Sequence, residues 1–126
     1  MDAARLNWLT AVETARLIAD GALSSEEHVR ACLARIEQTE PTVQAWAHLD
    51  PDSALEQARD ADQRRMRGAP GGPLHGVAVG VKDIIDVRGL PTEDGTVLHA
   101  GRLPRHDATV VSRLRAAGAV ILGKTS

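Results

Sequence analysis

The length of 126 residues allows one domain at most. Hydrophobic residues make up 43% of the chain and charged residues 25%, a balance that excludes a disordered or membrane-embedded protein. The net charge of −2 provides no basic excess for direct binding to nucleic acid.

Residues 1–68 are predicted to be mainly helical, because three polar N-terminal caps precede runs with apolar side chains at helical spacing. The predicted helices are residues 11–19 (cap Thr10 with Glu13), 25–39 (Ser24 with Glu27) and 51–68 (Asp50 before Pro51). We expect the second helix to end near Thr39, since Pro41 disfavours helical backbone at the residue before it. Residues 43–49 form a short run typical of a strand.

The second part of the chain alternates strand and helix. After a Gly- and Pro-rich stretch at 68–73, residues 77–82 form an apolar run that is too short for a helix and indicates a buried strand. Asp107 is expected to cap a helix over 108–117, and residues 119–122 form a second buried strand. This order predicts two parallel strands joined by a right-handed crossover.

These elements predict an α/β fold in a single domain. A helical segment over residues 1–68 precedes the first βαβ strands of an α/β core over residues 69–126. A buried parallel sheet needs covering layers on both faces, and two strands do not form a stable sheet alone. We therefore expect residues 1–126 to be the N-terminal part of one larger domain, incomplete as it stands.

Lys82 is the candidate functional residue, because it is a charged side chain at the end of the apolar strand 77–81. Burial would disfavour its ammonium form and make the neutral amine a general base near neutral pH. Asp83 follows directly, but successive strand residues point to opposite faces, so it need not be the partner of Lys82. The alternative is a lysine whose stem packs on the strand end while its ammonium group lies in water.

Three segments resemble the motifs of the amidase signature family, in the order and spacing of that family. Residues 72–83 (GPLHGVAVGVKD) resemble G-P-L-x-G-(I/V)-P-(V/I)-x-(V/I)-K-D. Residues 90–96 (LPTEDGT) resemble L-P-T-x-x-G-S/T, and residues 107–125 resemble D-A-x-x-V-x-x-L-R-x-A-G-A-V-(I/V)-L-G-K-T. The likeness is close over residues 72–126 and loose over residues 6–68.

The resemblance implies the mixed sheet of that family and an enzyme that cleaves linear carboxylic amides through a Ser–cis-Ser–Lys triad. It makes Lys82 the catalytic lysine, which accepts a proton from the attacking serine through a bridging serine. Backbone N–H groups of a Gly-rich loop would stabilise the oxyanion. We expect no cofactor and no metal, a small-molecule amide as substrate, and a homodimer as one option. Ala78 replaces the usual proline and Ile84 the frequent asparagine, which we interpret as tolerated variation.

The two serines of such a triad have no counterpart in these 126 residues. In the family they follow the G-K-T segment in a Gly- and Ser-rich stretch, and nothing resembling G-G-S-S-G-G-S occurs here. We therefore expect the 126-residue chain alone to be inactive. One alternative is the amidase subunit of a glutamyl-tRNA(Gln) amidotransferase, which passes ammonia to partner subunits. Another alternative is a non-catalytic binding or assembly module. The sequence does not identify the amide substrate.

Several other motifs have ordinary structural explanations. Residues 118–125 match the letters of a phosphate-binding P-loop, but their middle residues are the predicted strand itself, which favours a core strand. The five histidines, among them His75, show no metal-ligand spacing. Arg64, Arg65 and Arg67 follow acidic residues on one predicted helix and indicate a solvated helix face.

The only cysteine, Cys32, excludes an internal disulfide and favours a reducing compartment. It lies in an apolar helical stripe, which predicts a buried thiol rather than a nucleophile. Residues 1–10 lack the apolar core of a signal peptide, and no apolar run reaches the roughly 18 residues of a membrane span. We therefore expect a cytoplasmic protein.

Overall fold

The computed structural model describes residues 2–69 and 71–126. Met1, in the predicted N-terminal segment, and Pro70, in the predicted loop 68–73, lie outside the described residues. The elements, with η for 3₁₀ helices, are η1 (Ala3–Trp8), α1 (Ala11–Ala19), α2 (Ser25–Val43), β1 (Trp46–Leu49), α3 (Pro51–Met66), β2 (Ala78–Lys82), η2 (Val97–His99), α4 (Thr109–Ala116) and β3 (Val120–Thr125). Within the described ranges, no helix combines the length and the apolar character needed to cross a membrane.

Three of the four predicted helix caps, those in residues 1–68, are confirmed. Thr10 accepts a hydrogen bond from the backbone N–H of Glu13, whose carboxylate accepts one from the N–H of Thr10. The same reciprocal capping box opens α2, and the Asp50 carboxylate accepts from the N–H of Ser53 at the start of α3. The starts of α1, α2 and α3 are therefore set by local contacts. The third helix ends at Met66, slightly before the predicted end.

The predicted end of the second helix near Thr39 is wrong. Helix α2 continues to Val43 and contains Pro41 in its last turn. The carboxylate of Glu40 accepts hydrogen bonds from the backbone N–H groups of Ala45 (2.7 Å) and Trp46 (2.9 Å). These two bonds hold the turn that follows the helix, which offsets the hydrogen bond that proline cannot donate.

The predicted role of Asp107 as a helix cap is also wrong. Helix α4 begins at Thr109, and its N-cap residue makes no side-chain hydrogen bond. The Asp107 carboxylate instead accepts from the backbone N–H of Arg88 (2.7 Å) and from Nε of Arg115 (2.9 Å). The carboxylate therefore links the loop after β2 to the last turn of α4, a long-range use that no local cap pattern reveals.

The three strands form one mixed sheet in the order β1-β3-β2. Strands β2 and β3 are parallel, as the strand–helix–strand order predicts, and β1 pairs with β3 in antiparallel fashion. The short β-like run in the helical N-terminal part thus supplies an edge strand of the same sheet. Strand β3 lies in the centre, which explains why nearly all of it is buried.

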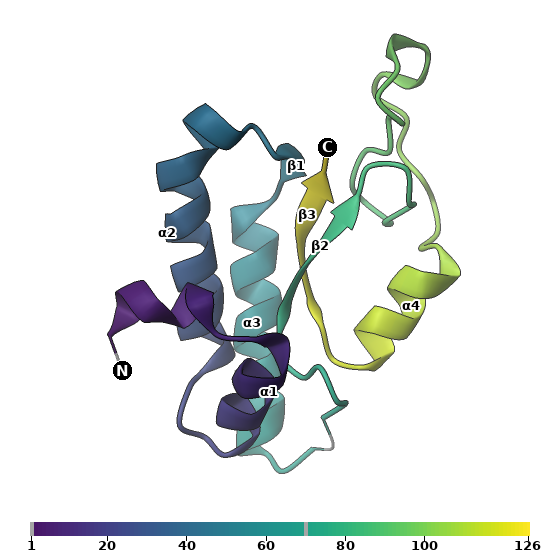
Figure 1. Ribbon diagram of the computed structural model, residues 1–126. Helices are drawn as coiled ribbons and strands as arrows, with labels where there is room; N and C mark the ends of the chain where they lie inside the picture. The colour runs from purple at the N-terminus through teal and green to yellow at the C-terminus, as the bar shows by residue number, and fades with distance from the viewer. Residues whose placement is uncertain (1, 70) are drawn as a thin grey trace.

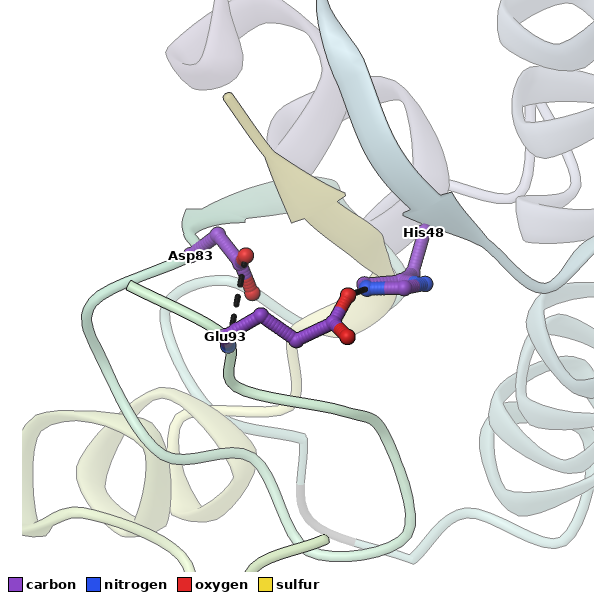
Figure 2. A group of neighbouring side chains, drawn as sticks. All are labelled: His48, Asp83 and Glu93. Carbon is purple, nitrogen blue, oxygen red and sulfur yellow. Dashed lines mark hydrogen bonds and ion pairs between the residues drawn. The ribbon is translucent and has the colours of Figure 1, made fainter. Parts of the chain in front are cut away.

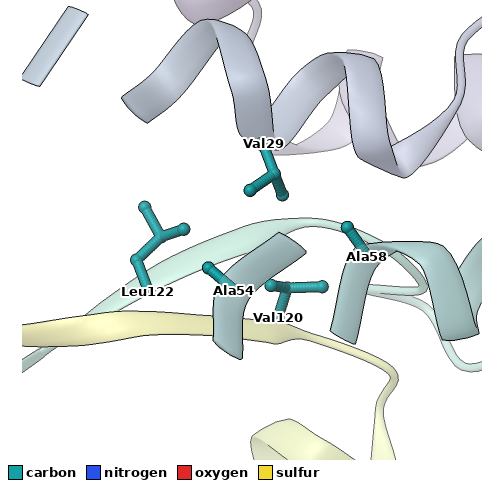
Figure 3. Close-up of a cluster of buried hydrophobic side chains, with 5 residues drawn as sticks. All are labelled: Val29, Ala54, Ala58, Val120 and Leu122. Carbon is teal, nitrogen blue, oxygen red and sulfur yellow. The ribbon is translucent and has the colours of Figure 1, made fainter. Parts of the chain in front are cut away.

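Helices cover both faces of the sheet (Figure 1). On one face, small side chains of α3 let that helix and α2 approach β3 closely (Figure 3). The buried members of this cluster are Val29, Ala54, Ala58, Val120 and Leu122. On the other face, α4 and the segment after β2 enclose a second cluster, whose buried members are Val81, Val87, Val111 and Ile121. The core around the sheet is therefore two thin aliphatic layers, one on each side of β3.

A register shift divides β3 at Leu122. The pairs along β2 and β3 are Val79 with Ile121, Gly80 with Gly123, Val81 with Lys124 and Lys82 with Thr125. Leu122 therefore has no partner on β2, and residues after it lie on the opposite face from the one that simple alternation predicts. Lys124 consequently shares the face of Val81, on the α4 side of the sheet. Lys82 and Thr125 lie on the face covered by α2 and α3.

Gln57 of α3 contacts the backbone of β3 next to this shift. Its side-chain carbonyl accepts from the N–H of Ile121 (3.0 Å), and its amide group donates to the carbonyl of the same residue (3.1 Å). A side-chain amide thus pairs with the strand as a neighbouring strand would.

His28 links α2 to the start of β2 and makes stability depend on pH. The side chain is buried, and its Nε2 accepts a hydrogen bond from the N–H of Ala78 (3.2 Å). Burial lowers the pKa of His28 below its ordinary value of 6.5. The unfolded chain therefore binds a proton at higher pH than the folded chain, and the free energy of unfolding falls as the pH decreases below about 6.5.

Urea unfolding between pH 7.5 and pH 5 measures this contribution. We expect the His28→Gln variant, which keeps an acceptor but does not titrate, to lose less stability than the unsubstituted protein over this range. His106→Gln, at an exposed position, is the control and should keep the original slope. Equal slopes for all three proteins would contradict the assignment.

Candidate functional site

Lys82 is the last residue of β2, opposite Thr125 at the end of β3. Its side chain is exposed. The backbone on either side is held, because the N–H of Asp83 donates to the carbonyl of Thr125 (2.8 Å) and the N–H of Ile85 donates to that of Lys82 (2.9 Å). The fold therefore presents an accessible amine on a fixed strand end.

The surface beside Lys82 on the same face is formed by an aromatic ring and a glycine. A Cβ placed on Gly80 would lie 2.9 Å from the ring of Trp46 and 3.1 Å from the methyl group of Thr125. The ring therefore lies against the strand where Gly80 has no side chain, while Gly80 itself stays exposed. This close packing accounts for glycine two residues before Lys82, inside an otherwise aliphatic strand.

From the sequence we considered Lys82 as a buried lysine, but in the structure the buried lysine is Lys124. These are the only two lysines of the chain, and Lys124 is 0% exposed. Its Nζ donates to Oγ1 of Thr92 (2.7 Å), to the carbonyl of Pro91 (3.1 Å) and to Oδ1 of Asp83 (3.2 Å). Asp83 thus pairs with the lysine across the sheet rather than with its neighbour Lys82.

Sequence reasoning missed Lys124 because it treated residues 118–125 only as a core strand or a P-loop. Strand β3 begins one residue after the start of the predicted strand 119–122 and runs three residues past its end, to Thr125, so it includes Lys124. A lysine two residues past the end of the predicted buried strand was the available signal, because a buried ammonium group needs partners. The face of the sheet on which Lys124 lies could not be predicted from the sequence, since that face depends on the register shift at Leu122.

The segment after β2 folds back on itself through ionic and backbone hydrogen bonds. Arg102 makes a two-pronged contact with the Asp86 carboxylate, at 2.8 and 3.1 Å, and its carbonyl accepts from the N–H of Thr92. This guanidinium holds the pKa of Asp86 below its ordinary value. The N–H of Asp94 donates to the carbonyl of Asp83 (3.0 Å). Residues 83–102 are therefore a structured loop next to Lys82.

Three titratable side chains that are distant in the sequence meet at this loop (Figure 2). Nε2 of His48 in β1 lies 2.6 Å from Oε1 of Glu93, whose N–H donates to Oδ2 of Asp83 (3.4 Å). The ligand atoms lie within 4.8 Å of one another, a grouping that the spacing of the histidines did not predict. The N–H of Gly101, together with His48, lowers the pKa of Glu93.

Hydrogen bonds account for this cluster. Glu93 Oε2 accepts from Gly101 and Oε1 contacts His48, while the two oxygens of Asp83 are used by Lys124 and by the N–H of Glu93. Every carboxylate oxygen thus has a partner within the protein. The nearby ammonium group of Lys124 also opposes binding of a further cation.

Two other residues that the sequence analysis named, Cys32 and His75, lie in structural positions away from Lys82. Cys32 on α2 is only partly buried, less than predicted, and this burial raises the pKa of its thiol. Nε2 of His75 donates to the carbonyl of Ala61 (2.8 Å) and connects the loop before β2 to α3. Neither residue contacts Lys82 in the hydrogen bonds of the described chain.

Comparisons with known proteins agree on one family. The family model described as Amidase matches residues 27–126. The chain is 47% identical over 119 residues to a glutamyl-tRNA(Gln) amidotransferase subunit of Chloroflexus aurantiacus, covering 94% of this chain and 24% of that protein.

Solved structures show the same likeness. A peptide amidase of Stenotrophomonas maltophilia is similar with a TM-score of 0.85 and 37% identity, over 92% of this chain and 24% of that one. A fatty acid amide hydrolase is similar with a TM-score of 0.92 and 30% identity, over 98% of this chain and 22% of that one. The chain thus spans about a quarter of the length of these proteins.

Proposed function

We propose a function that follows from the family of this chain, since the chain belongs to the amidase signature family. In this proposal, Lys82 is the proton-accepting lysine of an enzyme that hydrolyses carboxylic amides. The observation that carries the proposal is the position of Lys82, the lysine of the G-P-L-x-G…K-D motif, with its amine exposed at a fixed strand end. A serine hydroxyl is a weak nucleophile until a positioned base takes its proton. An accessible lysine on a rigid element can be held in a fixed position, which supports its assignment as such a base.

The proposed reaction uses residues of this chain together with two serines outside the 126 residues. The neutral amine of Lys82 accepts a proton from a bridging serine, which accepts one from the attacking serine. The proton then passes back from Lys82 through the bridging serine to the amide nitrogen, so that ammonia or an amine leaves and an acyl-enzyme remains. Water attacks the acyl-enzyme, releases the acid and restores the serine hydroxyl. Since both serines are needed, we expect the 126-residue polypeptide alone to be inactive.

The same proposal treats residues 1–126 as the opening part of a single domain. Several large apolar side chains on and around the loop after β2 are exposed in this part of the structure. They include Ile84, Val97, Leu98, Leu103 and Val110. Exposure of several large apolar side chains in one part of the chain favours contact with further protein. We assign this contact to the rest of the amidase domain, since the related structures are about four times longer.

A specific observation favours one alternative, an amidotransferase subunit. Curated relatives at 44–48% identity are named as a subunit of glutamyl-tRNA(Gln) amidotransferase. In that case the full protein transfers ammonia to partner subunits instead of releasing it. A homodimer, a non-catalytic assembly module and the cytoplasmic location remain predictions from the sequence.

The proposal is tested on the full-length protein that contains these residues. Ammonia release is measured from glutamine, propionamide and benzamide, with and without any subunits that co-purify from the native host. Release by the protein alone supports the hydrolase, and release from glutamine that requires the co-purified subunits supports the amidotransferase alternative. No release from any of the three amides in either form would support the non-catalytic module and overturn the proposal.

A further inference from the structure

A fully buried lysine lies one residue pair away from Lys82 across the sheet. An ammonium group taken out of water is costly unless it is paired and hydrogen-bonded. Lys124 is 0% exposed, and its three hydrogens all have acceptors, namely one carboxylate, one hydroxyl and one backbone carbonyl. Such a complete set of partners shows that the site is built for the charged amine.

The partners of Lys124 all belong to the segment that follows Lys82. Asp83 is the next residue, and Pro91 and Thr92 lie in the loop that returns toward it. Asp83 is additionally bonded through its backbone, as donor to Thr125 and as acceptor from Asp94. The ammonium group of Lys124 thus joins the end of β2, the loop and β3 at one point.

The two lysines occupy opposite faces of the sheet. Lys124 lies opposite Val81 on the α4 side, whereas Lys82 lies opposite Thr125 on the other face. Asp83 nevertheless follows Lys82 directly in the chain, and its carboxylate is paired with the ammonium group of Lys124. In the folded protein that charge is neutralised from the buried side by Lys124.

We propose that Lys124 is a positioning residue for Lys82. It neutralises Asp83, so that this carboxylate does not act as a counterion for the Lys82 ammonium, and it ties the strand end that carries Lys82 to β3. This inference rests on the proposed function of Lys82. Lys124 itself touches no substrate, since it is buried on the other face.

Charge logic makes the two single substitutions act in opposite directions. The other titratable groups around the pair are His48 and Glu93 beside Asp83, and Asp86 in the same loop. Lys124→Met leaves the Asp83 carboxylate unpaired, which favours protonated Lys82 and moves the acid limb of kcat/KM to higher pH. Asp83→Asn leaves the ammonium group of Lys124 without its carboxylate partner. This disfavours protonated Lys82 and moves the acid limb of kcat/KM to lower pH.

The experiment measures kcat, KM and the pH profile of the full-length protein with the amide that it hydrolyses fastest among glutamine, propionamide and benzamide. The variants are K124M, D83N and the double variant K124M/D83N, with thermal midpoints recorded for each. We expect kcat at neutral pH to fall about tenfold or more in all three, with KM within about twofold. The acid limbs of the two single variants should move apart, and that of the double variant should stay near the original.

The double variant keeps the test decisive if a single variant does not fold, because it leaves no unpaired charge in the interior. A double variant with unchanged kcat would show that the pair is merely structural and overturn the inference. Equal acid limbs in two folded single variants would do the same. Lys82→Ala separates this failure from failure of the proposed function, since only the latter leaves the Lys82→Ala protein active.

Discussion

Replacing Lys82 with alanine is expected to lower kcat/KM for amide hydrolysis by about 10³-fold or more in the full-length protein. A positioned general base contributes factors of roughly 10² to 10⁴, and here the same amine activates the nucleophile in the first step. Because Lys82 belongs to neither of the aliphatic clusters that hold the sheet together, the substitution should leave the thermal midpoint nearly unchanged. Steady-state ammonia release and thermal unfolding measure the two effects separately.

Two further variants separate proton transfer from charge at this position. Lys82→Arg keeps the positive charge but cannot give up its proton at working pH, so we expect it to be as inactive as the alanine variant. Arg105→Ala removes another exposed cation of the chain and should keep full activity. An active Lys82→Arg enzyme would exclude the base role and leave only an electrostatic one.

Gly123→Ala is expected to have the largest effect on stability, about 3 kcal/mol or more. A Cβ at this position would overlap the backbone carbonyl oxygen of His48 and lie 3.0 Å from the Cα of Leu49. Backbone atoms of a paired strand cannot move aside as a flexible side chain does. The methyl group therefore forces β1 away from β3, and the free energy of unfolding, measured in urea, should fall accordingly.

Gly89→Ala is the matched control. Gly89 has a positive φ of 86°, but no atom lies within 4 Å of a Cβ built there. The Gly89→Ala substitution should lower the free energy of unfolding by only about 1 kcal/mol, through backbone strain. If the two substitutions destabilise the protein equally, the close approach of β1 to Gly123 is not what requires glycine.

Local patterns in the sequence predict most of the elements of this fold. The capping boxes at Thr10 and Ser24 place helix starts correctly, since each uses contacts within three residues. The parallel pair of β2 and β3 follows from the order of strand, helix and strand. Pro41 shows the limit of such rules, because the Glu40 carboxylate that supports the extended helix binds residues beyond its predicted end.

The sequence alone also determines the family and points to Lys82, since the amidase motifs are contiguous strings of residues. Only the tertiary structure decides which lysine is buried and what surrounds it. Lys124 reaches Asp83, 41 residues away, because the register shift at Leu122 places it on the α4 face of the sheet. His48 meets Glu93, 45 residues further on, because β1 joins the sheet edge. Strand register and sheet order arise from packing between distant segments, and no local spacing in the chain records them.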